Sequence, residues 1–308
     1  MFGGVNRALR EAKAWMTGSL LVAALVIPGV ANAQDVRLPV SASFSILGDL
    51  VRAVGGDRID LTTLVGPDQD AHVYEPTPAD IGKLTATKVF FINGLGFEGW
   101  MPRLRKASHY TGRVVEVTEG LKPRTTRDQG KLVTDPHMFQ DPALAKAMVT
   151  RIRDALTEAD PAGKTYYAER AKNYELALDD LITWARKQLA PISPTRRVVL
   201  TSHDAFGYLG ERFDIRFLAP EGVSTESEAS ARDVAKLIRV IRTTGVKAVF
   251  MENITNPRLI ERIAHDAKVQ VDGKLYSDAL SQNQEASTYL QLFQHNIRAI
   301  AAAMKDDR

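Results

Sequence analysis

Two hydrophobic patterns alternate along most of the chain. Short runs rich in β-branched residues predict strands, and segments with apolar residues three or four positions apart predict helices. In a first block, the expected strands are 38–43, 61–65, 88–92 and 113–117, with helices over 46–54 and 78–86. In a second block, they are 197–201, 215–218, 248–251 and 269–271, with helices near 228–244 and 257–267. This alternation predicts an α/β fold of two lobes with mainly parallel sheets.

A long stripe of apolar residues separates the two blocks. Its members recur four or three positions apart and define one helix face: Tyr167, Ala171, Tyr174, Leu178, Leu181, Ala185 and Leu189. Asp160 and Pro161 are typical of a helix start, and Pro191 ends the pattern, so we expect a helix over 160–190. At about 1.5 Å per residue, this helix is roughly 45 Å long and passes along both lobes as a rigid linker. The alternative is a single domain in which it is merely the longest surface helix.

The first 33 residues have the order of a secretory signal peptide. Arg7, Arg10 and Lys13 precede an apolar run over 20–27, and the small residues at 31–33 form a cleavage site. The apolar run is much shorter than the roughly 20 residues of a membrane-spanning helix. We therefore expect cleavage after Ala33 and release into the periplasm. An uncleaved anchor or a buried helix is the alternative.

Composition narrows the class of protein. The chain has no cysteine, which excludes disulfides, thiolate ligands and lipid attachment through cysteine, so the mature protein is not expected to be a lipoprotein. Without the three basic residues and one acidic residue of the leader, the formal charge falls from +3 to +1. Because no long basic tract is present, no nucleic-acid partner is expected. The predicted organisation is a signal peptide over 1–33, an N-terminal lobe over 34–159, a linker helix over 160–190 and a C-terminal lobe over 191–308.

Four side chains on predicted loops are candidates for metal binding. His72 and His203 follow predicted strands, His137 precedes a predicted helix, and Asp278 follows the last predicted strand. Open parallel sheets bind ligands at such strand ends, and three imidazoles with one carboxylate suit tetrahedral zinc. Separations of 65, 66 and 75 residues are not a local metal motif, however, so spacing alone leaves these residues open to a solvated or capping role. The other histidines are interpreted as structural or exposed: His109, His265 and His295.

Two further patterns would suggest enzymes. Residues 94–99 match the dinucleotide-binding pattern G-x-G-x-x-G, but a tight turn with Gly94 and Gly96 at positive φ is the preferred interpretation. Residues 202–204 read Ser-His-Asp, yet a catalytic triad converges in space rather than along the chain, and no H-E-x-x-H helix occurs. An exported zinc-dependent hydrolase that uses three of the histidines stays open, because catalytic zinc keeps one position for water.

From about residue 36 to the C-terminus, the chain resembles the metal-specific solute-binding proteins of bacterial ABC importers, the zinc and manganese family. Five segments carry the resemblance in family order: 72–76 (HVYEP), 93–98 (NGLGFE), 135–142 (DPHMFQDP), 201–206 (TSHDAF) and 276–278 (YSD). The resemblance implies two lobes joined by the long helix, with a metal site in the cleft between them. It implies one ligand from each of four loops, namely His72, His137, His203 and Asp278. It also implies a transport protein rather than an enzyme.

Zinc is the implied ion, with one bound per chain. In the family that this chain resembles, the manganese branch has a carboxylate as the third ligand, whereas this sequence has His203. Manganese favours more oxygen donors than this set offers. The implied function is high-affinity capture of zinc in the periplasm and delivery to a cognate ABC permease by a monomer. A manganese or iron protein of the same family is the alternative.

The sequence departs from the family pattern in two places. Phe139 and Gln140 stand where the family usually has Trp-Leu. Residues 121–134 contain no histidine, where many zinc members carry a loop rich in histidine and acidic residues. The second departure leaves a periplasmic zinc metallochaperone as another delivery route.

Overall fold

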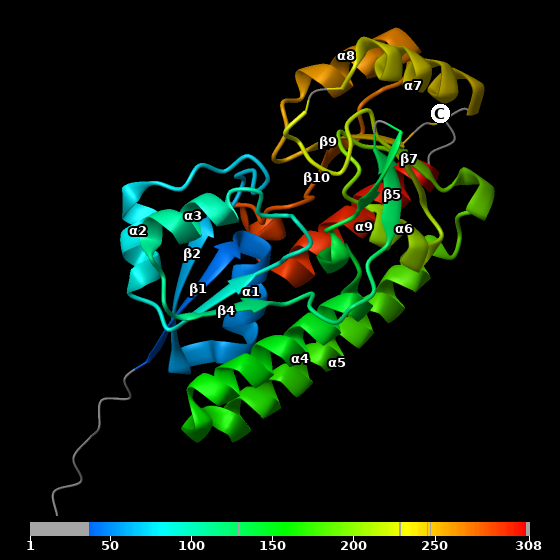
Figure 1. Cartoon of the computed structure of the whole chain (residues 1–308). Helices are drawn as coiled ribbons and strands as arrows, with labels where there is room; N and C mark the ends of the chain where they lie inside the picture. The colour runs from blue at the N-terminus through cyan, green and yellow to red at the C-terminus, as the bar shows by residue number, and fades with distance from the viewer. Residues whose placement is uncertain (1–36, 129, 228, 245, 247, 306–308) are drawn as a thin grey trace, which may run out of the picture. The chain divides into compact units, whose positions relative to one another are not determined.

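The computed structural model describes residues 37–305 apart from 129, 228, 245 and 247. The predicted signal peptide lies outside the described residues. The described chain contains two parallel four-stranded sheets with helices packed around them, which confirms the predicted two-lobe α/β fold (Figure 1). Within this described part, no helix is both long enough and apolar enough to cross a membrane.

The first lobe is built on a sheet with the strand order β2-β1-β3-β4. Its strands are β1 (Leu38–Phe44), β2 (Ile59–Val65), β3 (Val89–Ile92) and β4 (Arg113–Glu116). The helices between them are α1 (Ser45–Gly55), α2 (Pro78–Thr85) and α3 (Met101–Ser108). Val40 in the central strand pairs with Leu61 on one side and Val89 on the other, and β1 is buried along almost its whole length, as parallel strands usually are. All four strands expected in this block are confirmed, with ends that shift by no more than two residues.

The second lobe repeats this plan with the strand order β10-β9-β7-β8. Its strands are β7 (Val198–Leu200), β8 (Arg216–Leu218), β9 (Ala248–Glu252) and β10 (Gly273–Leu275). The helices between them are α6 (Gly207–Phe213), α7 (Ala231–Thr244) and α8 (Arg258–Ala267). The last helix of the described residues is α9 (Tyr289–Lys305), which packs beside β9 and β10.

The last predicted strand, 269–271, is wrong, because β10 lies four residues later. Val269 closes the end of α8 instead, since its backbone N–H donates to the carbonyl of Ala264. Val269 and Val271 pack against the apolar cluster under α7 and α8 without pairing in the sheet. The β-branched residues Val269 and Val271 led to a wrong strand prediction, because they are partly buried against a helix end and not in a sheet.

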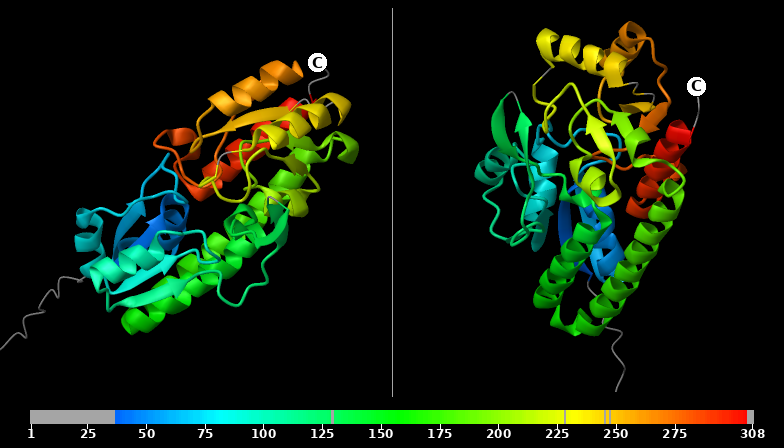
Figure 2. Two further views of the ribbon diagram at one scale, coloured as in Figure 1. Left: turned by 45° about the horizontal axis from the view of Figure 1, so that its top comes forward. Right: turned by 90° about the vertical axis from the view of Figure 1, so that its right-hand side faces the viewer.

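The long helix is α5 (Lys164–Leu189), and it follows a short 3-10 turn, η3 (Pro161–Gly163). The predicted start at Asp160 is four residues early. The carboxylate of Asp160 instead accepts from the Tyr167 hydroxyl at 2.7 Å and from Arg58 Nε at 2.9 Å. α5 lies beside α4 (Pro142–Ala159) and contacts α1 of the first lobe as well as α9 (Figures 1 and 2). Six of the seven predicted stripe residues are buried, and Tyr174 is half-buried.

One apolar core continues through both lobes. It includes Phe44 and Phe97 of the first lobe, Tyr167 of α5, and Phe206 and Phe250 of the second lobe. A smaller cluster lies between the second sheet and helices α7 and α8. Apolar surface stabilises a fold by about 25 cal/mol for each Å² removed from water, so wide separation of the lobes would expose this core at a large free-energy cost. The packing favours movement of loops over hinging of lobes.

A small hairpin that the sequence analysis did not predict lies before His137. Strands β5 (Thr125–Asp128) and β6 (Lys131–Thr134) pair antiparallel and occupy most of the segment 121–134. The hairpin has little apolar character, and its Leu132 side chain is exposed. It contacts the second lobe through the hydroxyl of Thr126, which donates to Asp204 at 3.2 Å.

Candidate metal centre

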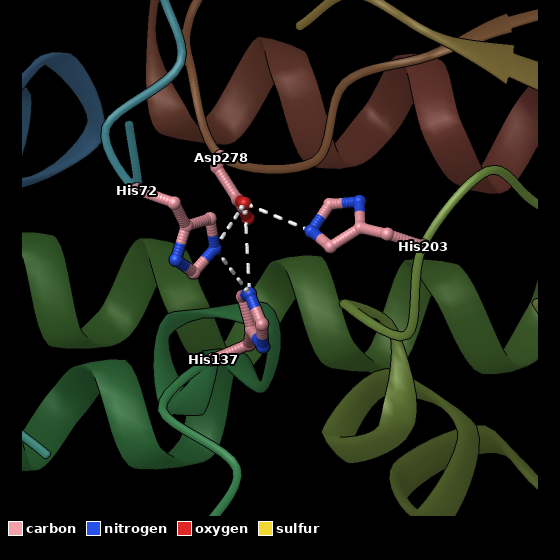
Figure 3. A group of neighbouring side chains, drawn as sticks. All are labelled: His72, His137, His203 and Asp278. Atoms are coloured by element: carbon pink, nitrogen blue, oxygen red, sulfur yellow. Dashed lines mark hydrogen bonds and ion pairs between the residues drawn. The ribbon is translucent and has the colours of Figure 1, made fainter. Parts of the chain in front are cut away.

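Four buried side chains from four separate loops converge on one point. One donor atom from each of His72, His137, His203 and Asp278 lies within 4.8 Å of the others (Figure 3). His72 is 4% exposed and the other three are fully buried. The structure thus brings together all four residues that the sequence analysis selected. It places the other histidines elsewhere: His109 at the end of α3, His265 exposed on α8 and His295 on α9.

The parallel sheets explain why these loops meet. His72 follows β2 and His203 follows β7, so both lie beyond the carboxyl ends of their strands. Asp278 follows β10 in the same way. His137 precedes α4, whose first turn is capped by Asp141 through a 2.9 Å bond from the backbone N–H of Ala143. Open α/β sheets place binding sites at these strand ends.

Four of the six separations between the donors are close to those around a tetrahedral ion. Asp278 Oδ2 lies 3.0 Å from His203 Nε2, 3.2 Å from His72 Nε2 and 3.5 Å from His137 Nε2. The Nε2 atoms of His72 and His137 are 3.3 Å apart. Zinc bonds to nitrogen and oxygen are about 2.0–2.1 Å long, and the donors of a regular tetrahedron with such bonds lie about 3.3–3.4 Å apart. A single small cation therefore matches the arrangement.

Two carboxylates hold histidine rings from behind. Asp135 Oδ1 lies 2.8 Å from His137 Nδ1 and also accepts from the backbone N–H of His137 at 2.9 Å. Glu252 Oε2 lies 2.6 Å from His203 Nδ1, and its Oε1 accepts from the backbone N–H of the same residue at 2.9 Å. A carboxylate at Nδ1 leaves Nε2 free to bind a metal. Asp135 orients the His137 ring through a hydrogen bond, whereas Glu252 contacts His203 Nδ1 as an ion pair whose geometry is not that of a hydrogen bond.

The glycine-rich stretch builds one wall of the site. Gly94 and Gly96 have φ of 88° and 82°, which confirms the predicted tight turn. The buried carboxylate of Glu98 accepts from the backbone N–H groups of Asn93 at 2.7 Å and Gly94 at 3.1 Å. Within this turn, Phe97 packs its ring edge-on against His72, with ring centroids 4.6 Å apart. The motif that resembles a dinucleotide site thus supports the histidines.

The first departure from the family pattern, at Phe139 and Gln140, contacts residues of the site and their neighbours. Phe139 packs against the rings of Phe44 and His137, with centroid distances of 5.2 and 5.8 Å. The side-chain amide of Gln140 donates to the carbonyl of Ser277, one residue before Asp278. Phe139 and Gln140 therefore still contact two of the converging loops. The segment without histidine, residues 121–134, forms the β5–β6 hairpin.

Charge pairing dominates the protonation of two histidines. Burial lowers the pKa of His137, but the negative charges of Asp278 and Asp135 outweigh it and raise the pKa to about 9. Burial also opposes protonation of His203, yet Glu252 and Asp278 raise its pKa well above the usual value. Without a metal, His137 is therefore charged, with a proton on both ring nitrogens, at neutral pH, and the same kind of pairing favours the charged form of His203.

The other two residues shift in the opposite direction. Burial lowers the pKa of His72 and outweighs the attraction of Asp278. Burial would raise the pKa of Asp278, but the charges of His137 and His203 hold it well below its usual range. Asp278 therefore stays ionised, as a metal ligand must be.

Sequence reasoning missed the supporting carboxylates. Asp135 stands two residues before His137, and Asp70 stands two residues before His72, where its Oδ1 accepts from the histidine backbone N–H at 2.9 Å. This repeated Asp-x-His pattern was a usable signal. Glu252 has no such signal, because it ends an apolar strand and reaches His203 only through the pairing of β9 with β7.

The chain matches a family model described as zinc-uptake complex component A, periplasmic (ZnuA), over residues 40–303. It is 31% identical to the manganese-binding lipoprotein MntA of Bacillus subtilis (strain 168) over 281 residues, which cover 89% of this chain and 92% of MntA.

Solved structures of similar proteins share the fold. The periplasmic zinc binding protein TroA from Treponema pallidum aligns with a TM-score of 0.82 and 28% identity, over 87% of this chain and 99% of TroA. A manganese-bound periplasmic metal binding protein from Candidatus Liberibacter asiaticus aligns with a TM-score of 0.78 and 26% identity, over 87% of this chain and 100% of that chain. These relatives are named for manganese or zinc, so they agree on metal binding and differ in the metal.

Proposed function

Because the chain belongs to the family of metal-binding solute-binding proteins of ABC importers, whose model is described as zinc-uptake complex component A, we propose that its cargo is zinc. In this proposal, His72, His137, His203 and Asp278 bind one zinc ion outside the inner membrane. The protein then delivers the ion to its cognate ABC permease.

Family membership confirms the predicted class of protein. The family and its relatives are extracytoplasmic solute-binding components of importers, which act with a permease and an ATPase, and they are not enzymes. The hydrolase alternative is therefore not favoured. Four protein donors would also fill a tetrahedron and leave no position for a catalytic water.

The observation that supports zinc is the donor set. Three imidazole nitrogens and one carboxylate oxygen converge within 4.8 Å of one another, and four of their six separations are 3.0–3.5 Å. Zinc accepts this mixture in four-coordinate sites, whereas manganese favours more oxygen donors and six-fold coordination. A manganese-binding role is the competing proposal, because relatives such as MntA are named for that metal.

Loading would replace protons with the metal ion. Imidazoles bind metal only when Nε2 is unprotonated, so zinc must displace the proton held by His137 and compete with protonation of His203. The continuous apolar core keeps the lobes together, and loading therefore acts mainly on the loops around the cleft. In this account, the permease distinguishes loaded from empty protein by the order of those loops.

Location and partners extend the proposal. We expect the mature protein to begin after Ala33 and to act in the periplasm as a monomer without a lipid anchor. MntA is named a lipoprotein, which runs against the last point, so the absence of an anchor stays a prediction. A periplasmic zinc metallochaperone remains a proposed additional partner.

The test is a competitive titration of chelator-stripped mature protein with zinc and with manganese. We expect one zinc per chain, bound in the sub-micromolar range and far more tightly than manganese. A preference for manganese would overturn the zinc assignment and leave the transport role intact. Binding of neither metal would overturn the proposal as a whole.

A further inference from the structure

The loop that carries His72 is bonded to the opposite lobe. This loop, residues 66–72, follows β2 of the first lobe, and we name it the His72 loop. Asp68 within it accepts from Asn253 Nδ2 at 3.1 Å and from the backbone N–H of Gln282 at 3.1 Å. Its own backbone N–H donates to the carbonyl of Leu280 at 2.8 Å. The His72 loop is therefore attached to the segment that follows Asp278.

A second carboxylate of the loop connects the ligand itself to the second lobe. Asp70 Oδ1 accepts from the backbone N–H of His72 at 2.9 Å. Asp70 Oδ2 accepts from the hydroxyl of Thr225 at 2.6 Å. Thr225 lies between β8 and α7 of the second lobe. One carboxylate thus holds both the ligand backbone and the opposite side of the cleft.

His72 is supported differently from the other histidines. His137 and His203 each have a supporting carboxylate against ring Nδ1, at 2.8 and 2.6 Å. For His72, the supporting carboxylate Asp70 contacts the backbone instead. The position of His72 therefore depends more on where its loop lies. His72 is also the most exposed of the four residues, and the next residue, Val73, is 48% exposed.

We propose that the hydrogen bond between Thr225 and Asp70 is a latch that sets the rate of metal release. The inference rests on the proposed function, because it assigns positioning residues to the same site. While the latch is closed, Asp70 holds the backbone of His72 in place over the ion. When it opens, His72 leaves first and the metal gains an exit. Glu226 and Ser227, next to Thr225, are exposed, so a docked permease can reach this loop.

The latch can be tested by removing one hydroxyl group. Thr225→Val removes the donor and keeps the β-branched shape, while Thr225→Ser keeps the donor. Thr126→Val is the matched control, since Thr126 also donates a hydroxyl across the lobes, to Asp204 at 3.2 Å, and Asp204 is not one of the four proposed ligands. Release of bound zinc into an excess of chelator is followed by stopped flow, and the association rate is measured separately.

We expect Thr225→Val to release zinc on the order of tenfold faster than wild type, which is the size of effect of a hydrogen bond to a charged group. Association should change little, and Thr225→Ser and Thr126→Val should release zinc at the wild-type rate. Equal release rates for Thr225→Val and wild type would overturn the latch. Equal acceleration by Thr126→Val would also overturn it, because the effect would then be general loosening of the lobes.

Two further measurements keep the result unambiguous. Thr225→Ala provides a second variant without the hydroxyl, and circular dichroism of each apo variant establishes that it is folded. The wild-type protein is titrated first, and the release experiment uses whichever of zinc or manganese it binds. A wild type that binds neither ion refutes the proposed function, whereas a wild type that binds while Thr225→Val releases at the same rate refutes only the latch.

Discussion

Glu252 lies behind the ring of His203, with Oε2 2.6 Å from Nδ1, while Asp278 lies 3.0 Å from Nε2 on the other side. The imidazole is therefore held between two buried carboxylates. Only one of them, Asp278, belongs to the converging donor set. The other fixes which nitrogen faces the metal.

Glu252→Gln should weaken zinc binding about tenfold or more. The neutral amide keeps one acceptor but presents an NH₂ group toward His203, which disturbs the ring orientation that Glu252 provides. Competition against a calibrated chelator at pH 7 measures the affinity. Glu261→Gln, on the exposed side of α8, is the control and should bind as wild type does. An unchanged affinity in Glu252→Gln would contradict the role of Glu252 in orienting His203 for the metal.

His203→Glu should move the metal preference from zinc toward manganese, since it adds oxygen donors. Glu252 opposes this change, because the new carboxylate would face a second buried carboxylate, and like charges in contact destabilise each other. We therefore expect the double variant His203→Glu with Glu252→Gln to bind manganese more tightly than the single variant does. A double-mutant cycle of the manganese affinities measures this coupling. Strict additivity of the two substitutions would rule out the proposed repulsion.

The sequence predicted the repeated parts of the fold well and the long-range contacts poorly. β1 and β9 were found because their apolar runs are buried on both faces. The hairpin of β5 and β6 was missed, since it buries little and has no apolar alternation. Val269 and Val271 suggested a strand but pack beside a helix end. Local hydrophobic patterns therefore predict an element correctly where its buried residues recur with the period of a helix or strand.

For the site, residue spacing could not show that four loops separated by more than 60 residues meet at one point. The resemblance supplied that grouping, and the structure places His72 and His203 on opposite sides of Asp278 (Figure 3). The roles of Glu252 and Thr225 depend on which strands and loops become neighbours across the lobes. That information lies in tertiary packing rather than in any local pattern.

Export should remove the leader after Ala33. Cleavage there would leave four residues before β1, which begins at Leu38, so the folded part would be intact. Expression of the full chain in a Gram-negative host, followed by mass spectrometry of the periplasmic fraction, should give a chain that begins at Gln34. Ala33→Arg should block processing, because the cleavage site requires small residues. If the wild-type protein were instead found at full length in the membrane fraction, the uncleaved alternative would be supported.

Zinc affinity should rise with pH up to about 9, beyond the range expected for ordinary histidines. The pKa of His137 is raised to about 9 and that of His203 lies well above its usual value, so protons compete with the metal throughout the neutral range. Each displaced proton contributes up to about tenfold in affinity per pH unit below the pKa of its group. Titrations in metal buffers from pH 5 to 9 measure the slope. An affinity that is constant between pH 5 and 8 would contradict ligation by these histidines.

The stability of the apo protein should depend on pH in the opposite direction to the zinc affinity, because the same protons are involved. A group whose pKa is raised on folding stabilises the fold below its unfolded pKa, about 6.5 for histidine, and loses that contribution as pH rises through the folded value. His137 should therefore stabilise the apo protein at pH 6 and cease to do so near pH 9. Zinc takes over the pairing with Asp278 as the protons leave. The difference in Tm between loaded and apo protein should accordingly widen from pH 6 to pH 9, and calorimetry of both forms measures it. A gap that stays constant or narrows over this range would contradict protonation of His137 in the apo protein.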